Sequence, residues 1–380
     1  MSAVEAPPRL GELIEEAQRV LAICNACRYC EGYCAVFPAL ERRLSFTEHD
    51  VHYLANLCHN CGSCLYACQY APPHEFQLNF PRVLAQVRKQ TYRRYAWPAS
   101  LARAFERNGL AVALLTVACL ALFFIAMALA DDPARLFRAY SDAEGSFYAV
   151  LPHGPMAGAF ALVFAYVILA FAMSFASFWP DTGELVSEFV SPAPSGGATW
   201  DALTLKYLDG GGAGCTYPDE KPSFARRNFH HLTFHGFMLC FAATCVATLY
   251  HYGFGWKAPY GFWSLPVLLG TVGGVGLLAG PAGLLWLKRR RDPLLVDPSQ
   301  DGMDLAFLAL LFLVSLSGLL LLALRETRAM GILLAVHLGA VLALFLSLPY
   351  GKFVHALYRF AALTRFHIER RRPLPEIGSE

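Results

Sequence analysis

The sequence predicts an all-α protein in which a small helical domain precedes six transmembrane helices. Hydrophobic residues make up 56% of the 380-residue chain and charged residues only 16%, whereas a soluble domain is nearer half apolar and a quarter charged. The apolar residues gather in long runs, and eight of the 12 cysteines lie ahead of the first run. With a net charge of only +2, the composition disfavours a disordered chain, a nucleic-acid-binding protein and a secreted disulfide scaffold.

Six apolar runs are long enough to cross a bilayer as helices. They cover residues 109–130, 155–179, 231–252, 264–287, 304–324 and 330–349. Each is close to or above the roughly 20 residues that span a hydrocarbon core. The alternative, buried helices of a large soluble core, would need far more polar covering than this chain has. We therefore expect a six-span domain over residues 96–380, embedded in a lipid bilayer.

Lysine and arginine residues predict the orientation of these helices, because cytoplasmic loops are enriched in them. They are concentrated before the first run, before the third, after the fourth and after the sixth: Arg82, Arg88, Lys89, Arg93, Arg94, Arg103, Arg107, Arg226, Arg227, Lys288, Arg289, Arg290, Arg291, Arg359, Arg365, Arg370, Arg371 and Arg372. The other loops are poorer in cations, and one of them also carries Asp142 and Glu144. We therefore expect a multi-pass protein of the cytoplasmic (inner) membrane with both termini in the cytoplasm. The first 23 residues contain no signal-peptide core.

Eight cysteines form one pattern that occurs twice. The first run is Cys24, Cys27, Cys30 and Cys34, and the second is Cys58, Cys61, Cys64 and Cys68. This spacing is typical of ferredoxins with two [4Fe-4S] clusters, in which the fourth cysteine of each run binds the other cluster. We therefore assign one cluster to Cys24, Cys27, Cys30 and Cys68, and the second to Cys34, Cys58, Cys61 and Cys64. Disulfides are disfavoured in a reducing cytoplasm, and structural zinc does not require this pattern.

The cysteine-bearing domain, residues 1–95, is expected to be a helical dicluster ferredoxin domain in the cytoplasm. The stretch at 36–57 has apolar residues at helical spacing and few alternating strand formers. In this it resembles the helical ferredoxins of respiratory iron–sulfur subunits. Ala35 and Gln69 stand where a proline usually follows the fourth cysteine, but that residue is not a ligand. The cysteines of the apolar runs are interpreted as packing residues: Cys119, Cys240 and Cys245.

Histidines near the ends of apolar runs predict a further cofactor, because polar residues at membrane depth are usually functional. His337 and His355 are 18 residues apart, which is about five turns of a helix, so one face would carry both rings about 27 Å apart. One helix would thus offer a ligand near each side of the membrane. The spacing resembles that in the cytochrome b subunits of respiratory nitrate reductase, so we expect a cytochrome b-like bundle.

The third apolar run would supply the partners of these two histidines. His251, at its outer end, is expected beside His337. The inner partner of His355 is one of three histidines at the start of the run: His230, His231 and His235. Each layer could then hold a b haem between two imidazoles, which predicts two haems or one.

The choice of haem ligands stays open, with His235 preferred on the inner side. On a straight helix His230 lies closest to the face of His251, but the arginines before it would leave it the most exposed of the three. A bend near Gly236 would favour His235. His153 could also serve the outer site. The alternative is that these are interfacial or hydrogen-bonded packing histidines.

The connection at 180–229 is the longest, and we expect it on the cytoplasmic side. The segment from Asp201 to Leu208 is predicted to form a short amphipathic helix. Four glycines then precede Cys215 and Tyr217: Gly210, Gly211, Gly212 and Gly214. They are weak support for a phosphate site, since no G-K-[ST] follows. We interpret the connection as a lid over the inner haem, or as a docking surface for the N-terminal domain or a partner.

Three features together resemble the tricarballylate (citrate) utilisation B protein family over nearly the whole chain. They are the doubled cysteine pattern, the stretch DALTLKYLDGGGAGCTYPDEKPSFARRNFHHLTFHGF and the histidine-bearing runs. The resemblance implies a membrane electron carrier with two [4Fe-4S] clusters and haem b. It further implies that the carrier reoxidises the reduced FAD of a separate dehydrogenase, the A protein, which converts tricarballylate to cis-aconitate. The electrons would pass to the quinone pool.

The expected function is therefore electron transfer from a partner flavin to quinone. The chain has no Rossmann glycine pattern after a strand and no HExxH, so we expect an electron-transfer subunit with no substrate site of its own. The same relay could serve a flavoprotein of cobalamin biosynthesis or another organic-acid dehydrogenase. A redox-sensing or transport protein without haem is a further alternative, disfavoured by the near absence of acidic residues within the runs.

Overall fold

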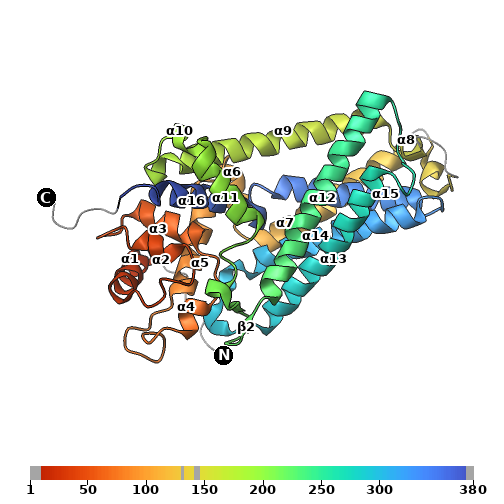
Figure 1. Cartoon of the computed structure of the whole chain (residues 1–380). Coiled ribbons are helices and arrows are strands. Elements are labelled where there is room, and N and C mark those ends of the chain that lie inside the picture. The colour runs from red at the N-terminus through yellow and green to blue at the C-terminus, as the bar shows by residue number, and fades with distance from the viewer. Residues whose placement is uncertain (1–9, 130–131, 141–145, 374–380) are drawn as a thin grey trace.

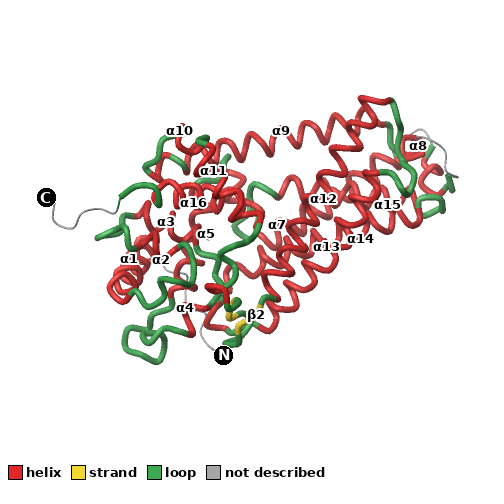
Figure 2. Tube along the Cα trace, in the orientation of Figure 1, coloured by secondary structure: helices red, strands yellow, loops and turns green. Residues whose placement is uncertain are grey.

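The computed structural model describes residues 10–129, 132–140 and 146–373, and within these ranges the architecture is all-α, as predicted (Figures 1 and 2). The exception among these residues is a short antiparallel pair formed by β1 (Cys215–Thr216) and β2 (Pro222–Ser223). Both chain ends, whose cytoplasmic location is predicted above, lie outside the described residues, as do Asp142 and Glu144.

The N-terminal domain is a small helical assembly around an apolar core. Its helices are α1 (Leu10–Cys27), α2 (Val36–Leu40), α3 (Glu48–Leu57), α4 (Ser63–Tyr66) and α5 (Phe80–Arg94). Leu21, Leu54 and Leu84 are fully buried in the core. The stretch at 36–57 is helical as predicted, but it forms two helices. The Thr47 side chain caps α3 and Asp50 completes the capping box, which starts a new helix there.

Each predicted apolar run corresponds to a long helix that extends away from the N-terminal domain (Figure 1). These are α7 (Asn108–Ala128), α9 (His153–Phe178), α12 (Ala225–Phe254), α13 (Leu265–Arg290), α14 (Asp301–Leu324) and α15 (Met330–Ser347). Within the described residues, six helices are long and apolar enough to cross a membrane. Their outward faces carry bare apolar side chains, such as Leu114, which is 61% exposed. Lipid tails cover such a surface in a bilayer, so this exposure indicates a membrane protein.

Short elements connect the long helices. They are α6 (Ala99–Ala104), η1 (Pro133–Phe137), α8 (Ser146–Val150), η2 (Pro180–Thr182), α10 (Val186–Phe189), α11 (Pro192–Leu203), η3 (Gly210–Gly212), η4 (Pro293–Leu295), η5 (Pro298–Gln300), η6 (Lys352–Val354) and α16 (His355–Glu369). Most of them lie in the long connection after α9 or at the N-terminal-domain end of the membrane helices, where they join the two parts of the chain (Figure 2).

Glycines allow α12 and α13 to approach closely. A Cβ on Gly236 would lie 2.8 Å from the carbonyl oxygen of Gly273, which no larger residue tolerates. Small residues let backbones meet in many membrane helix pairs. Helix α12 continues through Gly236 without interruption, so this glycine, which the sequence suggests as a bend, serves helix packing.

His337 and His355 do not share a helix, which corrects the prediction that one face carries both. Helix α15 ends at Ser347, and α16 begins at His355 after the 3-10 turn η6. Pro349 lies within the break. Because proline has no N–H to continue the helical hydrogen bonds, it ends α15. The 18-residue spacing therefore does not align the two rings.

The predicted helix at 201–208 is wrong, because α11 begins at Pro192 and ends at Leu203. Pro192 lies in the first turn, where a missing N–H is tolerated. Gly197 faces α16, where an added Cβ would lie 2.6 Å from the His367 ring. Proline and glycine usually interrupt helices, but here Pro192 begins α11 and Gly197 lets it pack closely against α16.

Helix α16 is fixed against the N-terminal domain by a buried charge cluster. Glu369 pairs with Arg43 and, at 3.1 Å, with Arg365, and it accepts a 3.0 Å hydrogen bond from the Tyr53 hydroxyl. Asp50 pairs with Arg43 at 2.6 Å and lies 3.4 Å from Arg365. The side chains of Arg43 and Glu369 are only 10% and 9% exposed. Since the charges alternate in sign, removing one leaves a buried partner uncompensated.

We expect Glu369→Gln to weaken this contact by about 3 kcal/mol, the cost of breaking a buried ion pair. The matched control is Glu16→Gln, whose ion pair with Arg19 is exposed and contributes below about 1 kcal/mol. Thermal unfolding of the purified proteins in detergent measures the difference. Equal melting temperatures for the two variants would contradict the role of the charge cluster.

Candidate functional site

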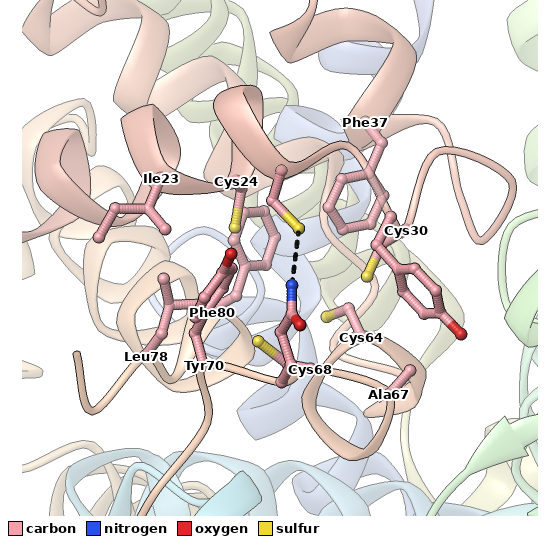
Figure 3. Close-up of a pocket in the computed structure, with 13 residues that line it drawn as sticks. Ile23, Cys24, Cys30, Phe37, Cys64, Ala67, Cys68, Tyr70, Leu78 and Phe80 are labelled. Carbon is pink, nitrogen blue, oxygen red and sulfur yellow. Dashed lines mark hydrogen bonds between the residues drawn. The ribbon is translucent and has the colours of Figure 1, made fainter. Parts of the chain in front are cut away.

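The cysteines line two adjacent cavities in the N-terminal domain. The first cavity has a volume of about 280 Å³ and is lined by five cysteines from both runs: Cys24, Cys27, Cys30, Cys64 and Cys68. In Figure 3 the sulfur atoms of Cys24, Cys30, Cys64 and Cys68 approach the same space. Tyr29 at its rim is 71% exposed, so this cavity lies close to solvent. We call Cys24, Cys27, Cys30 and Cys68 the outer cysteine set.

The second cavity is narrower and more deeply buried. It is lined by four cysteines, again from both runs: Cys34, Cys58, Cys61 and Cys64. Cys58 and Cys61 are 5% and 7% exposed. We call these four residues the inner cysteine set. Both groupings contain the residues that the sequence assigns together, although Cys64 also borders the first cavity.

Crowding of the sulfur atoms changes their protonation. Burial and the neighbouring Cys68, Cys27 and Cys61 raise the pKa of Cys30 to about 12. Burial and nearby cysteines also raise the pKa of Cys24. Several thiolates cannot easily coexist in such a space unless a cation compensates their charge. Among the described residues, no group of three or more His, Cys, Asp or Glu side chains is arranged to hold a single metal ion.

At the inner end of the membrane domain, two histidine rings lie close to each other. His230 on α12 and His355 at the start of α16 have ring centroids 6.2 Å apart, with the rings nearly perpendicular at 85°. The Nδ1 atom of His355 lies 2.6 Å from the carbonyl oxygen of Lys352, which leaves its Nε2 free. Nδ1 of His230 is buried without a hydrogen-bond partner in the described structure. The pair thus has unsatisfied nitrogen atoms in a shared space.

The expectation that His230 is the most exposed of the three inner histidines is wrong. His235 is exposed, whereas His230 is partly buried. His231 and His235 stack on each other, with ring centroids 5.4 Å apart. The helical face that carries His230 turns toward α16, so the arginine before it does not draw it into solvent.

The predicted outer pair, His251 and His337, contacts different elements. His251 stacks on His153 with ring centroids 3.9 Å apart, which leaves no room for an ion between the rings. His337 packs against α14, where its Nδ1 lies 3.1 Å from the carbonyl oxygen of Val314 and 3.2 Å from the Ser317 hydroxyl. This contact fits the hydrogen-bonded packing histidine left open above, and equally a ligand whose Nδ1 is held by a backbone carbonyl oxygen.

Sequence reasoning missed the arginines that join the inner cysteine set to the histidine pair. Arg226 donates to the carbonyl oxygen of Asn60 at 2.5 Å, and Arg359 donates to that of Cys58 at 2.8 Å. The spacing in the sequence could have indicated them, because Arg226 lies four residues before His230 and Arg359 lies four residues after His355. On a helix this spacing puts each arginine on the same face as its histidine, one turn away.

His59 was also missed, although it lies between two residues of the second cavity wall. It is 6% exposed and lines that cavity. Its Nδ1 lies 3.0 Å from the carbonyl oxygen of Leu57. Burial, followed by the charges of Arg359, Arg226 and Arg88, lowers the pKa of His59, so the ring is neutral and the surroundings are strongly cationic.

Residues 210–217 of the long connection, the glycine-rich segment, cover the inner cysteine set. Cys215 is fully buried against Cys61 and packs with Leu65 of α4. A hydrogen bond from Cys215 is the largest of the influences that lower the pKa of Cys61 to about 6. A Cβ on Gly210 would lie 2.6 Å from the Ser63 hydroxyl. Of the interpretations above, the segment matches a docking surface for the N-terminal domain.

Comparisons with known proteins match nearly the whole chain to one family. The sequence model described as "Citrate utilization protein B Fer4-like domain" matches residues 17–94, and the one described as "Citrate utilization protein B" matches residues 103–376. A protein of Escherichia coli named "Citrate utilization protein B" is 52% identical over 364 residues, which cover 96% of this chain and 94% of that protein. No solved structure matches this chain.

We expect Gly62→Ala to displace the glycine-rich segment. Gly62 has a φ of +87°, and an added Cβ would lie 2.4 Å from the carbonyl oxygen of Thr216, so both the strain and the clash act on the contact. The matched control is Gly32→Ala, where nothing lies within 4 Å of the added atom. Limited trypsin digestion after Lys206 should become faster in Gly62→Ala alone. Equal digestion rates in both variants would show that the contact does not hold the segment.

Proposed function

The chain belongs to the citrate utilization protein B family, and on this premise we propose that it is a membrane electron-transfer protein that serves a partner dehydrogenase. It accepts the electrons of the partner's reduced FAD and delivers them, through two [4Fe-4S] clusters and haem b, to the quinone pool. The observation that carries the proposal is that two cysteine-lined cavities lie next to a close histidine pair at the N-terminal-domain end of the membrane helices.

The cysteine sets fit iron–sulfur clusters better than single ions. Each cavity is lined by cysteines from both runs, as expected when the fourth cysteine of each run crosses to the other cluster. The first cavity, about 280 Å³ in volume, suits a compact cluster, whereas the second is only about 10 Å³, and its assignment rests on the four cysteines that line it. A zinc ion would require four ligand atoms within about 2.3 Å of the metal. We propose that the outer cysteine set holds one [4Fe-4S] cluster and the inner cysteine set the other.

The pair His230 and His355, with ring centroids 6.2 Å apart, would hold a haem b between two imidazoles, and the haem would supply a one-electron step there. The contact of His355 Nδ1 with the Lys352 carbonyl oxygen is typical of a metal-binding histidine, because it fixes the ring orientation and the tautomer.

The outer haem stays a prediction. His251 lies against His153, with ring centroids 3.9 Å apart, and the two rings would have to separate before iron could bind between them. His337 makes an Nδ1 contact with a backbone carbonyl oxygen of the same kind as His355. We therefore propose one haem at the inner pair and leave the second haem, with His251 and His337 as its predicted ligands, to measurement.

The order of the sites follows from burial and contacts. The outer cysteine set lies beside exposed Tyr29, where a soluble partner can approach. The inner cysteine set is buried, and Arg226 and Arg359 connect its backbone to the helices of the histidine pair. When bound, the clusters and the haem supply one-electron steps that accept the two electrons of a reduced flavin singly. Electrons would thus enter at the outer set and move toward the membrane.

The family indicates the partner protein, and the distribution of lysine and arginine indicates the membrane and the orientation. The family name favours a pathway of citrate or tricarballylate use, so we propose an FAD-dependent dehydrogenase of the tricarballylate type as the electron donor. The cationic loops favour the cytoplasmic membrane with the N-terminal domain, residues 1–95, and both termini in the cytoplasm. Substrate chemistry then belongs to the partner, and this chain contributes the electron path.

Purified protein in lipid vesicles should reoxidise a reduced dehydrogenase flavin in the presence of quinone under anaerobic conditions. We expect Cys34→Ala to reduce the rate to that of empty vesicles, because Cys34 is assigned to the inner cysteine set. Cys119→Ala, buried in α7, is the control and should keep the wild-type rate. Flavin absorbance and quinol yield measure the reaction. A wild-type rate in Cys34→Ala would contradict the proposed path.

The haem ligands are tested by haem content. We expect His230→Ala and His355→Ala to lose the inner haem, because each removes one axial ligand. His235→Ala is the matched control, since His235 lies on the same helix but is exposed, and it should keep the haem. A pyridine-haemochrome assay on the purified variants decides the matter. Haem lost from His235→Ala but retained by His230→Ala would restore the ligand that the sequence favours.

A further inference from the structure

Three arginines from separate parts of the chain converge on the segment that carries the inner cysteines. Arg88 of α5 donates to the carbonyl oxygens of Cys58 at 2.5 Å and Ala55 at 3.0 Å. Arg359 of α16 reaches Cys58 at 2.8 Å, and Arg226 of α12 reaches Asn60 at 2.5 Å. The backbone at 58–60 is therefore surrounded by positive charge from three helices.

These arginines have no carboxylate partner among the described residues. Their hydrogen bonds go to backbone carbonyl oxygens, and Arg226 also lies over the Tyr217 ring, 4.5 Å from its centre. Arg88 is only 5% exposed. Carbonyl dipoles satisfy the donors but do not cancel the charge, and an uncompensated buried cation is costly. The arrangement is expected where an anion is bound nearby.

The surroundings of the outer cysteine set are different. The neutral amide of Gln69 contacts this set, with its Nε2 4.0 Å from Cys27 Sγ. The nearest arginine in the sequence, Arg28, is exposed and donates to the carbonyl oxygen of Asn25 at 3.0 Å. The two cysteine sets thus lie in unequal electrostatic environments.

We propose that Arg88, Arg226 and Arg359 raise the reduction potential of the inner cluster above that of the outer cluster. This rests on the function proposed above, in which each cysteine set holds a [4Fe-4S] cluster. Reduction adds one negative charge to a cluster, and nearby cations stabilise the reduced form. One electron then leaves the outer cluster, which is oxidised, and enters the inner cluster, which is reduced. No covalent bond changes, and the arginines act as positioning residues that make transfer toward the membrane favourable.

The test is an anaerobic redox titration of the full-length protein in detergent, with both clusters followed by electron paramagnetic resonance. In wild-type protein we expect two distinct potentials, and the higher one should disappear in Cys34→Ala. In Arg226→Gln, the ratio of reduced to oxidised inner cluster at a fixed potential should fall about tenfold, which is about 59 mV for a one-electron couple. The outer cluster should not change.

Two further variants separate charge from structure. Arg226→Lys keeps the positive charge and should retain most of the wild-type potential. Arg227→Gln is the matched control, because Arg227 is the adjacent residue but donates to the carbonyl oxygen of Thr204 at 2.9 Å, away from the cysteines. It should leave both potentials unchanged.

Distinct outcomes overturn the inference and the proposed function. If both clusters are present but Arg226→Gln leaves the inner potential unchanged, or shifts both clusters equally, the inference is wrong and the relay stands. The inference is also wrong if the higher wild-type potential survives in Cys34→Ala, a comparison that does not depend on the folding of any arginine variant. If wild-type protein contains no clusters, the proposed function fails and the inference fails with it.

Discussion

The position of α16 is the constraint on which the rest of the structure depends. Its last turn is held by the buried charge cluster of Arg43 and Glu369. Its first residue is His355, and Arg359, one turn later, contacts the backbone of Cys58. One rigid helix therefore sets the relation between the N-terminal domain and the membrane bundle. Since electron transfer slows steeply with distance, a single short helix is an effective way to keep both sites in range.

The positions of the charged residues follow from the fact that part of the protein lies in lipid and part in water. The membrane helices expose apolar side chains to lipid, and most of the buried charged side chains lie where the helices meet the N-terminal domain, with Arg325 at the far end of α14 as an exception. At the junction with the N-terminal domain, the arginines hold the backbone around Cys58, and the glycine-rich segment closes over Cys61. The long connection thus completes the burial of the inner cysteine set. The sequence alone left several roles open for this connection.

The features that depend on short stretches of sequence could be predicted. The thickness of a bilayer sets the length of the six apolar helices, and the short spacing of the cysteines within each run predicts which sulfur atoms lie together. The histidine pair could not be predicted in the same way, because it depends on the break at Pro349 and on which face of α12 meets α16. From the sequence, His235 was preferred over His230, because a bend was expected at Gly236 and the neighbouring arginines were expected to leave His230 exposed. The helix at Pro192–Leu203 was missed because its glycine packs against His367, a contact between residues far apart in the sequence.

The most direct measurement is a count of non-haem iron, acid-labile sulfide and b haem on one sample of purified protein. The account predicts about eight irons and eight sulfides, for two [4Fe-4S] clusters, together with at least one b haem per chain. A sample with intact clusters but no haem would contradict the central claim that electrons leave the N-terminal domain through a histidine-held haem. Quinone would then have to take its electrons from the inner cluster, and the pairing of His230 with His355 would be a packing contact.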